Sequence, residues 1–496
     1  WTTRATAHSC GDTGHLPGEE GRFVPRFQFH CASANPNLAA LAVPGCSVCF
    51  VQMGSLDRRI FHLAVPALGA LVAEPLFLLT DTAMVGHLGA DALASLGVAS
   101  TIITTLVGLL IFLAYATTPL VARRLGSGDR TGALSAGIDG VWLAAGLGVV
   151  VGFAGYLLTP ALIGFFPATS TVSAGATAYV SISWWGLPGM LIVLAATGVL
   201  RGLQDTKTPL VVAVAGFGAN AGLNAVLIYG LGLGLEGSAW GTVIAQWGMA
   251  VVFVLLILTQ ARTHRARLLP GRLGLVAAAR SGSWLLLRTV SLRIALVATV
   301  LVATGMGTQE LAAWHIVFTL FSLLALALDA LAIAGQALIG HDLGAGNQAA
   351  VRLVTNRLIR WGFLAGGGLA ALTGLLSPLI PLVMTSDPSL RSTLWPVIVL
   401  LGLTLPLSAF VFVLDGVLIG AGDGKYLAIT GLLNVAMYAP MLWLAPLVVF
   451  GRDGVNLGGL LALEAAFGIG YIGARALTLG MRYRGEAWLV VGKTPS

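Results

Sequence analysis

Six carboxylates lie inside long apolar stretches of the sequence, where a charged side chain is costly. They are Glu74, Asp81, Asp139, Asp329, Asp415 and Glu464. A charged side chain facing lipid at the middle of a bilayer would cost at least about 2.5–3.5 kcal/mol. We therefore expect all six to face protein or a water-filled cavity, where a carboxylate can bind a proton, a metal cation or a cationic ligand.

Glu74 and Asp81 stand seven residues apart in the first apolar stretch. Seven helical steps of about 100° return to within about 20° of the same face, so we expect both acids to look into one place. Pro75 lies between them and Pro66 lies earlier in the same stretch, which removes two backbone hydrogen bonds and lets the helix bend. A bendable helix with two buried acids is a candidate switch. The structural alternative is that both acids only hydrogen-bond to neighbouring helices.

Asn220 and Asn224 are four residues apart in the fifth apolar stretch and so share a helix face. Their amides are either part of a polar site or hydrogen-bonding groups that hold helices together in the membrane.

Arg288, Arg293, Asp329 and Asp415 are predicted to be buried together in the second half of the chain. Such a group carries little net charge, so a structural role is favoured over transport chemistry. From their depth alone, we expect Arg357 and Arg475 to be the partners of Asp139 and Glu464, because pairing is the cheaper explanation for these acids.

The composition indicates a chain that is solvated mainly by lipid, since 57% of the residues are hydrophobic and only 9% are charged. A span of about 20 residues crosses the hydrocarbon core, and about twelve apolar runs of that length occur. The predicted spans are 60–86, 91–122, 132–159, 173–200, 209–231, 236–261, 283–305, 309–340, 350–376, 391–420, 425–449 and 455–481.

The two halves of the chain are related by an internal repeat. A shift of 218 residues places Gly89 on Gly307, Gly126 on Gly344 and Asp205 on Asp423 without a gap. Two parallel copies of a hydrophobic bundle that face each other across a central cavity are a plan used by transporters. We therefore predict an all-α membrane protein with twelve transmembrane helices in two six-helix lobes.

Basic residues mark the predicted boundaries and the orientation. An N-lobe at 53–261 and a C-lobe at 283–481 are joined by a basic connector at 262–282, and a tail follows at 482–496. Lys and Arg gather in the loops on one side, whereas the opposite loops carry only Arg391 and Arg452. By the positive-inside rule, both termini are cytoplasmic and the protein is a multi-pass protein of the inner or plasma membrane. This asymmetry accounts for the net charge of +7, so we expect no nucleic-acid partner.

The first 52 residues are polar, interrupted by Gly and Pro, and hold all four cysteines. We interpret residues 1–52 as a non-native or disordered extension before a native start at Met53. The alternative is a zinc site that would use the following residues: His8, Cys10, His15, His30, Cys31, Cys46 and Cys49. Their spacing is not that of known zinc modules, so we expect no metal.

Several motifs are similar to those of multidrug and toxic compound extrusion (MATE) transporters, in particular the DinF branch. They are VPALG at 65–69, AEPL at 73–76 and TDTAMVGHLG at 80–89, with RGLQDTKTP at 201–209 and LDGVLIGAGD at 414–423. The resemblance covers about residues 55–485. It implies export of lipophilic, usually cationic, compounds in exchange for protons or sodium.

The resemblance also implies roles for individual residues. Asp81 matches the coupling aspartate of the first helix, and Pro66 matches the proline at which that helix bends. Archaeal members surround the acid with an asparagine, an aspartate and a threonine, where this chain has Asn220, Asn224 and Thr242. One carboxylate has become an amide, and a hard cation prefers charged oxygens, so protons are favoured over sodium as the coupling ion.

The expected mechanism is antiport without a cofactor, in which protons and a cationic substrate compete for Asp81 and Glu74. The expected partners are small lipophilic or cationic substrates and membrane lipids, and we expect a monomer. Two other classes stay open. A flippase for lipid-linked precursors would need a strongly cationic cavity, and a membrane-embedded enzyme would need a metal or nucleophile motif such as His-Glu-x-x-His.

Overall fold

The structure is a computed structural model that describes residues 46–449 and 456–492, with side chains from Gly54 onwards. All of the described side chains belong to one compact unit of the chain, which begins at Met53. The cysteines and histidines of the alternative zinc site lie outside the described side chains. Arg452 and the last four residues of the predicted tail also lie outside the described residues.

Twelve helices are long and apolar enough to cross a membrane, which confirms the predicted number of spans within the described residues. The elements are α1 (Cys46–Gly86), α2 (Ala90–Leu110), α3 (Phe112–Gly126), α4 (Arg130–Gly164), α5 (Ser170–Ser183), η2 (Trp184–Gly186), α6 (Leu187–Gly202), α7 (Lys207–Asn224), η3 (Ala225–Gly230), α8 (Gly234–Thr263), α9 (Arg272–Met306), α10 (Thr308–Gly344), α11 (Gln348–Leu376), α12 (Ile380–Met384), α13 (Pro388–Gly420), α14 (Gly424–Leu444), η4 (Ala445–Leu447), α15 (Leu457–Ala465), η5 (Ala466–Tyr471) and α16 (Ile472–Arg484).

Several spans extend beyond the apolar runs that predicted them. The helix α9 already begins at Arg272, so the second half of the predicted connector at 262–282 is helical. Apolar composition marks the part of a helix that lies in lipid, whereas the helix itself continues into the polar region. Two spans change to a π-helix along their length, at η3 and at η5, a feature that is frequent at functional sites.

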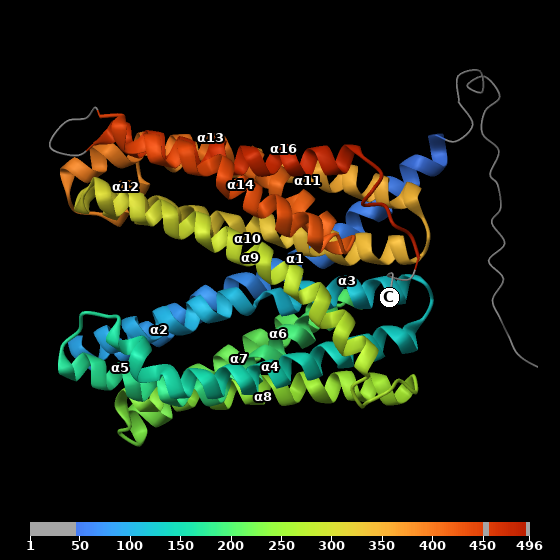
Figure 1. The fold of residues 1–496 in the computed structure, drawn as a ribbon, viewed down its shortest axis with the longest axis horizontal. Helices are drawn as coiled ribbons and strands as arrows, with labels where there is room; N and C mark the ends of the chain where they lie inside the picture. Colours follow the sequence, from blue (N-terminus) through green and yellow to red (C-terminus); the bar gives the residue numbers. More distant parts are fainter. Residues whose placement is uncertain (1–45, 450–455, 493–496) are drawn as a thin grey trace, which may run out of the picture. The chain divides into compact units, whose positions relative to one another are not determined.

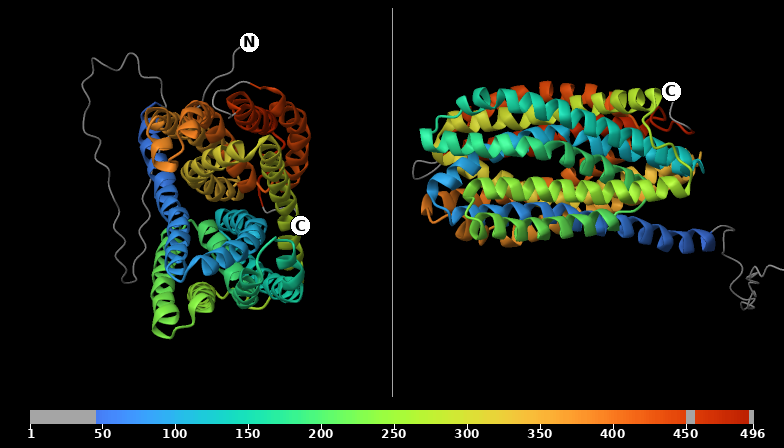
Figure 2. Two further views of the ribbon diagram at one scale, coloured as in Figure 1. Left: turned by 90° about the vertical axis from the view of Figure 1, so that its left-hand side faces the viewer. Right: turned by 90° about the horizontal axis from the view of Figure 1, so that it is seen from below.

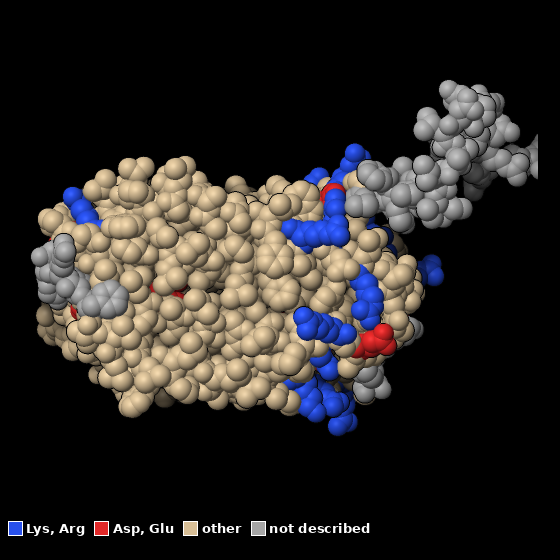
Figure 3. Space-filling model, turned by 90° about the horizontal axis from the view of Figure 1, so that it is seen from above, with Lys and Arg blue, Asp and Glu red and all other residues tan. Residues whose placement is uncertain are grey.

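The helices form two groups that follow the repeat. Figure 1 shows α2–α8 in blue to green on one side and α10–α16 in yellow to red on the other, with α9 crossing from the first group to the second. The left-hand view of Figure 2 shows the same separation from a second direction. Helix α3 of the first group packs on α9 and on α10 of the second group. Lys and Arg gather toward one end of the helices (Figure 3), as the predicted orientation requires.

The contact between α3 and α10 is reciprocal. A Cβ atom on Gly126 would lie 1.9 Å from the carbonyl oxygen of His341, and one on Gly344 would lie 2.0 Å from that of Arg123. The repeat pairs Gly126 with Gly344 and Arg123 with His341. Each lobe therefore presents the same glycine to the same backbone position of the other, and the backbones approach as closely as only glycine permits.

Helix α1 contacts both lobes. At its basic end, the Asp57 carboxylate accepts hydrogen bonds from Arg357 Nε at 2.6 Å and from Trp361 Nε1 at 2.9 Å. Both donors belong to α11 of the C-lobe, and Phe61 packs edge-on against Trp361 with ring centroids 4.6 Å apart. The expected pairing of Arg357 with Asp139 is wrong, because depth along the membrane does not reveal which helices are neighbours. Helix α1 thus crosses from one lobe to the other.

We expect Gly344→Ala to separate the basic ends of the two lobes. The added methyl group must displace the backbone of Arg123, and such overpacking costs about 1–3 kcal/mol. Spin labels at the exposed positions Ser127 and Ala345, in a variant without the four native cysteines, should report a longer distance. Gly367→Ala is the matched control, since nothing lies within 4 Å of its added Cβ. An unchanged distance in Gly344→Ala would contradict the close contact.

We expect Asp57 and Arg357 to stabilise the protein jointly. Their side chains are each 22% exposed, so the double variant should lose less stability than the sum of the losses in the two single variants. A double-mutant cycle with Asp57→Asn and Arg357→Gln, followed by unfolding in detergent, measures this coupling. Strictly additive effects would show that the pair does not hold α1 to α11.

Candidate functional site

Asp81 is buried where α1 meets the N-lobe. Only 6% of the surface of this residue is exposed. One carboxylate oxygen, Oδ1, accepts two hydrogen bonds of 2.7 Å, from Asn224 Nδ2 and from Ser238 Oγ. The other oxygen, Oδ2, has no hydrogen-bond partner within 46–449 and 456–492. The arrangement holds a carboxylate in place and leaves one oxygen able to take a proton.

The polar residues predicted on the fifth and sixth spans lie around this carboxylate. Asn220 Nδ2 donates a hydrogen bond of 3.1 Å to Thr242 Oγ1, one helical turn away from the Asn224 and Ser238 pair. The amide oxygens of Asn220 and Asn224 are buried without a partner in the described part of the chain. Unpaired buried acceptors call for a hydrogen-bond donor such as a bound water molecule.

Two residues of this site were not predicted from the sequence. Ser238 lies four positions before Thr242 on α8, so the two share a helix face, and this spacing could have identified it. The buried Tyr179 of α5 lies beside Asp81, Ser238 and Thr242. Nothing in the sequence places α5 next to this site, because that depends on how the helices pack.

The local backbone makes room for the amide of Asn224. The π-helix η3 begins at the next residue, Ala225. On the facing helix α8, a Cβ atom on Gly241 would lie 2.0 Å from Asn224 Oδ1. Glycine at 241 is therefore required for Asn224 to reach Asp81.

Glu74 does not join the Asp81 site, contrary to the expectation that both acids look into one place. Its side chain is exposed and makes no hydrogen bond or ion pair within the described residues. Seven helical residues advance by about 10 Å along the axis, so a shared face does not bring two carboxylates into contact. Pro66 and Pro75 both lie inside α1, which remains one helix.

In the charged cluster of the C-lobe, Asp329 lies near Arg288 and Asp415, whereas Arg293 does not join them. Arg288 is paired with Asp415, which also accepts from Arg475 Nη2 at 3.1 Å. Tyr115 of the N-lobe donates a hydrogen bond of 3.5 Å to Asp329. Arg293 is exposed and lies against Gly108 instead of joining the cluster. The side of the helix that Arg293 occupies could not be assigned without its neighbours.

Asp139 and Glu464 also differ from expectation. Asp139 accepts hydrogen bonds from Arg267 Nη2 at 2.8 and 2.9 Å, so its partner is in the connector. Arg475 belongs to Asp415, and Glu464 has no ion-pair partner in the described part. A connector that folds back onto α4 cannot be foreseen from membrane depth.

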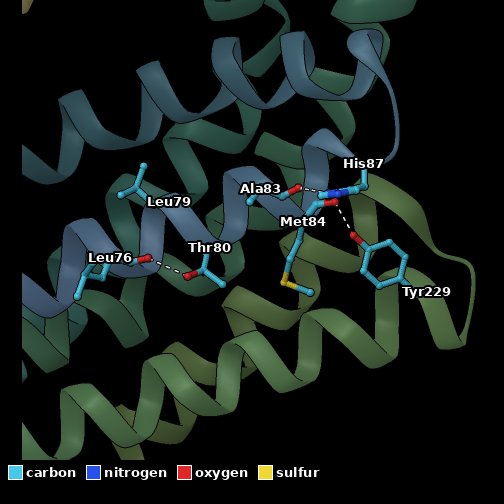
Figure 4. A pocket seen from close by; sticks show the side chains of 7 residues that line it. All are labelled: Leu76, Leu79, Thr80, Ala83, Met84, His87 and Tyr229. Carbon is cyan, nitrogen blue, oxygen red and sulfur yellow. Dashed lines mark hydrogen bonds between the residues drawn. The ribbon is translucent and has the colours of Figure 1, made fainter. Parts of the chain in front are cut away.

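A hollow of about 550 Å³ lies along the half of α1 that ends at Gly86, called here the outer half (Figure 4). Tyr229 of η3 lies at one end of it and donates a hydrogen bond of 2.6 Å to the Met84 carbonyl. Its lining is mostly apolar and consists of Leu76, Leu79, Thr80, Ala83, Met84, His87 and Tyr229. Asp81 is not part of this lining, because it points from α1 toward α7 and α8.

Comparison with known proteins gives the family. The MatE family model matches residues 66–226 and 287–444. The chain is 30% identical over 445 residues to Protein DETOXIFICATION 44, chloroplastic, of Arabidopsis thaliana, covering 85% of this chain and 83% of that protein. It is 26% identical over 446 residues to the DNA damage-inducible protein F of Escherichia coli K12, covering 83% and 94%.

A solved structure shares the fold. It is an outward-facing conformation of a multidrug resistance MATE family transporter of the MOP superfamily, with a TM-score of 0.77 at 22% identity, covering 87% of this chain and 96% of that chain. The fold and the family are those of membrane transporters. Because the family model matches more than half of the chain, this protein belongs to the MatE family of multidrug and toxic compound extrusion transporters.

Proposed function

We propose that the protein is a secondary active transporter that exports lipophilic or cationic small molecules in exchange for protons, with Asp81 as the coupling acid. The observation that carries this proposal is a buried carboxylate with one oxygen bound to two other helices and the second oxygen unpartnered in the described part of the chain. Relatives bear names that include "multidrug resistance protein", which supports the class of substrate. The positive-inside rule supports cytoplasmic termini in a cell membrane.

The geometry of Asn224 supports protons over sodium. Because a carboxylate oxygen only accepts hydrogen bonds, the amide must turn its NH₂ group toward Asp81. The amide oxygen then points away, toward Gly241, and is not directed at a cation bound to Asp81. The site therefore offers one negative charge and few aligned oxygens, where a hard cation prefers several.

Protonation of Asp81 weakens the hydrogen bonds that attach the outer half of α1 to the N-lobe. The ionised carboxylate accepts charge-assisted hydrogen bonds from Asn224 and Ser238, and these weaken when the carboxyl becomes neutral. The helix can then move about Pro66 and Pro75, which lack two of its backbone hydrogen bonds. At its other end, α1 is attached to the C-lobe through Asp57. Protonation is thereby linked to the relative position of the lobes.

The proton gradient supplies the driving force. Each proton that moves inward gains about 2.3 kcal/mol per 100 mV of membrane potential. Glu74 makes no ion pair within the described residues, so its carboxylate can attract a cationic substrate toward α1.

A flippase for lipid-linked precursors is less well supported. Such a protein needs cationic groups that are free to bind a pyrophosphate. Here Arg288 and Arg475 share the carboxylate of Asp415, so both are already engaged by an acid.

We expect Asp81→Asn to abolish proton-driven transport. The asparagine keeps the size of the side chain and cannot exchange a proton. The measurement is movement of a fluorescent lipophilic cation in vesicles under an imposed pH gradient without sodium, and then under a sodium gradient alone. Glu236→Gln, at an exposed position on α8, is the control and should transport normally. Full proton-driven transport by folded Asp81→Asn protein would overturn the role of Asp81.

We expect Asn224→Asp to make transport sensitive to sodium. The variant places a second carboxylate at the position from which Nδ2 now reaches Asp81 at 2.7 Å, and two acids there supply the charged oxygens that a hard cation prefers. In the same vesicle assay, a sodium gradient alone should drive transport in the variant and not in the wild type. Sodium-driven transport by the wild type would show that the amide geometry does not select protons.

A further inference from the structure

The C-lobe contains a polar group at the place that the repeat assigns to the Asp81 site. The shift of 218 residues puts Thr299 at the position of Asp81 and Tyr438 at that of Asn220. These two side chains are hydrogen-bonded, with 2.7 Å between Thr299 Oγ1 and the Tyr438 hydroxyl. The same pair of helices in the repeat thus meets through polar side chains in both lobes, although the acid on the first helix is absent from the C-lobe.

An acid is supplied instead by the twelfth span. Glu464 of α15 is 1% exposed, and its Oε1 is buried without a hydrogen-bond partner in the described residues. The Tyr471 hydroxyl on the same span is also buried without a hydrogen-bond partner in the described residues. Tyr438 lies beside both residues, and its ring centroid is 5.3 Å from that of Tyr471. Two unpaired polar atoms in one core require an explanation, such as a bound water or ion.

The helix around Glu464 is irregular in the same way as the helix around Asn224. The π-helix η5 runs from Ala466 to Tyr471 and begins two residues after Glu464, as η3 begins directly after Asn224. A π-helix changes the direction of the side chains that follow it and occurs frequently at functional sites. In both lobes, this irregularity adjoins a buried polar side chain.

Tyr471, on the same span as Glu464, lies at the edge of a cavity. It lines a space of about 10 Å³ together with Arg288, Asp415, Asn434 and Arg475. That volume is about the size needed for a single water molecule, and the polar lining offers it several partners. The Tyr471 hydroxyl can both donate and accept a hydrogen bond. It makes none with Glu464, and one water molecule between the two would give both unpartnered atoms a partner and a path for a proton.

We propose that Glu464 is a second proton-binding site, located in the C-lobe, which is loaded and emptied during the transport cycle. Loading takes a proton from hydronium in the cavity and leaves a water molecule. The tyrosine hydroxyl receives this proton as it gives its own to a water molecule, and that water gives a proton to a carboxylate oxygen of Glu464. Release follows the same steps in reverse. The binding of the proton does not depend on the proposed function, whereas its contribution to transport rests on it.

Some of the surroundings of Glu464 favour its neutral carboxyl group and others favour its ionised form. Tyr438 faces it from α14 and Thr299 adjoins that tyrosine from α9, while Tyr471 lies on its own span. Burial without a partner favours the neutral acid. Beyond Tyr471 lie Arg288 and Arg475 with the carboxylate of Asp415 between them. A net positive charge there favours the ionised acid, so that motion of this cluster during lobe movement changes the preference.

Infrared spectroscopy of the whole protein tests the binding step. The carbonyl absorption of protonated carboxyl groups should decrease as pH is raised, and Glu464→Gln should remove one carboxyl's share of this change. The isosteric amide is a mild substitution, since the repeat already places Gln246 at the equivalent position of the N-lobe. Glu236→Gln is the matched control on a surface glutamate. A pH-dependent change that is identical in wild type and Glu464→Gln would overturn the proposal.

The ratio of protons to substrate tests the contribution to transport. The membrane potential at which net transport stops gives this ratio, and we expect Glu464→Gln to lower it by one proton. An unchanged ratio would show that Glu464 is a permanently neutral structural group. The infrared test needs no transport, so its result stands even if the protein proves not to be an antiporter. If the infrared test is negative while transport is active, the role of Glu464 is overturned and the proposed antiport is not.

Tyr471→Phe keeps the proposal testable if Glu464→Gln fails to fold. It removes a hydroxyl that has no partner in the described residues, so folding should be retained. The titrating carboxyl should remain, and its proton exchange should become slower. Exchange at the wild-type rate would exclude Tyr471 as the connection to the cavity, and a missing titration would exclude Glu464.

Discussion

The rest of the structure depends on the two hydrogen bonds that Asp81 accepts from Asn224 and Ser238. In a protein surrounded by lipid, a charge in the interior is tolerated only where the protein itself solvates it. These donors belong to α7 and α8, so the ionised acid joins three helices of one lobe. The same bonds fix the outer half of a helix whose other end is attached to the opposite lobe. In the proposed mechanism, a change of one charge at Asp81 therefore acts on a helix that contacts both lobes.

The fold could be predicted from the sequence to a large extent, because lipid imposes a simple rule on the chain. Every span needs about 20 apolar residues, and basic residues collect at one side. The twelve spans follow from the first rule. The additional turns of α9 do not, since a helix can continue through a polar segment once neighbouring helices pack on it.

The site was only partly predictable, and the errors have a common cause. Spacing along a helix predicted that Asn220 and Asn224 share a face, and the resemblance to the family placed them with Thr242 near Asp81. Spacing also fixes depth, but it says nothing about which helices are lateral neighbours. Glu74, Arg293, Arg357 and Arg475 were all assigned by depth or face, and all four have surroundings different from those expected. The unforeseen crossing of α1 to the C-lobe alone explains why Arg357 is bound to Asp57.

The contact of Gly126 with His341 and of Gly344 with Arg123 has a further consequence. Because the repeat pairs these residues, one half of the chain carries both surfaces of the contact. Such a surface is complementary to itself, as in a two-fold symmetric dimer. Two separate copies of one half could close on each other through the same contact, so the covalent connection between the lobes is not what determines how they meet.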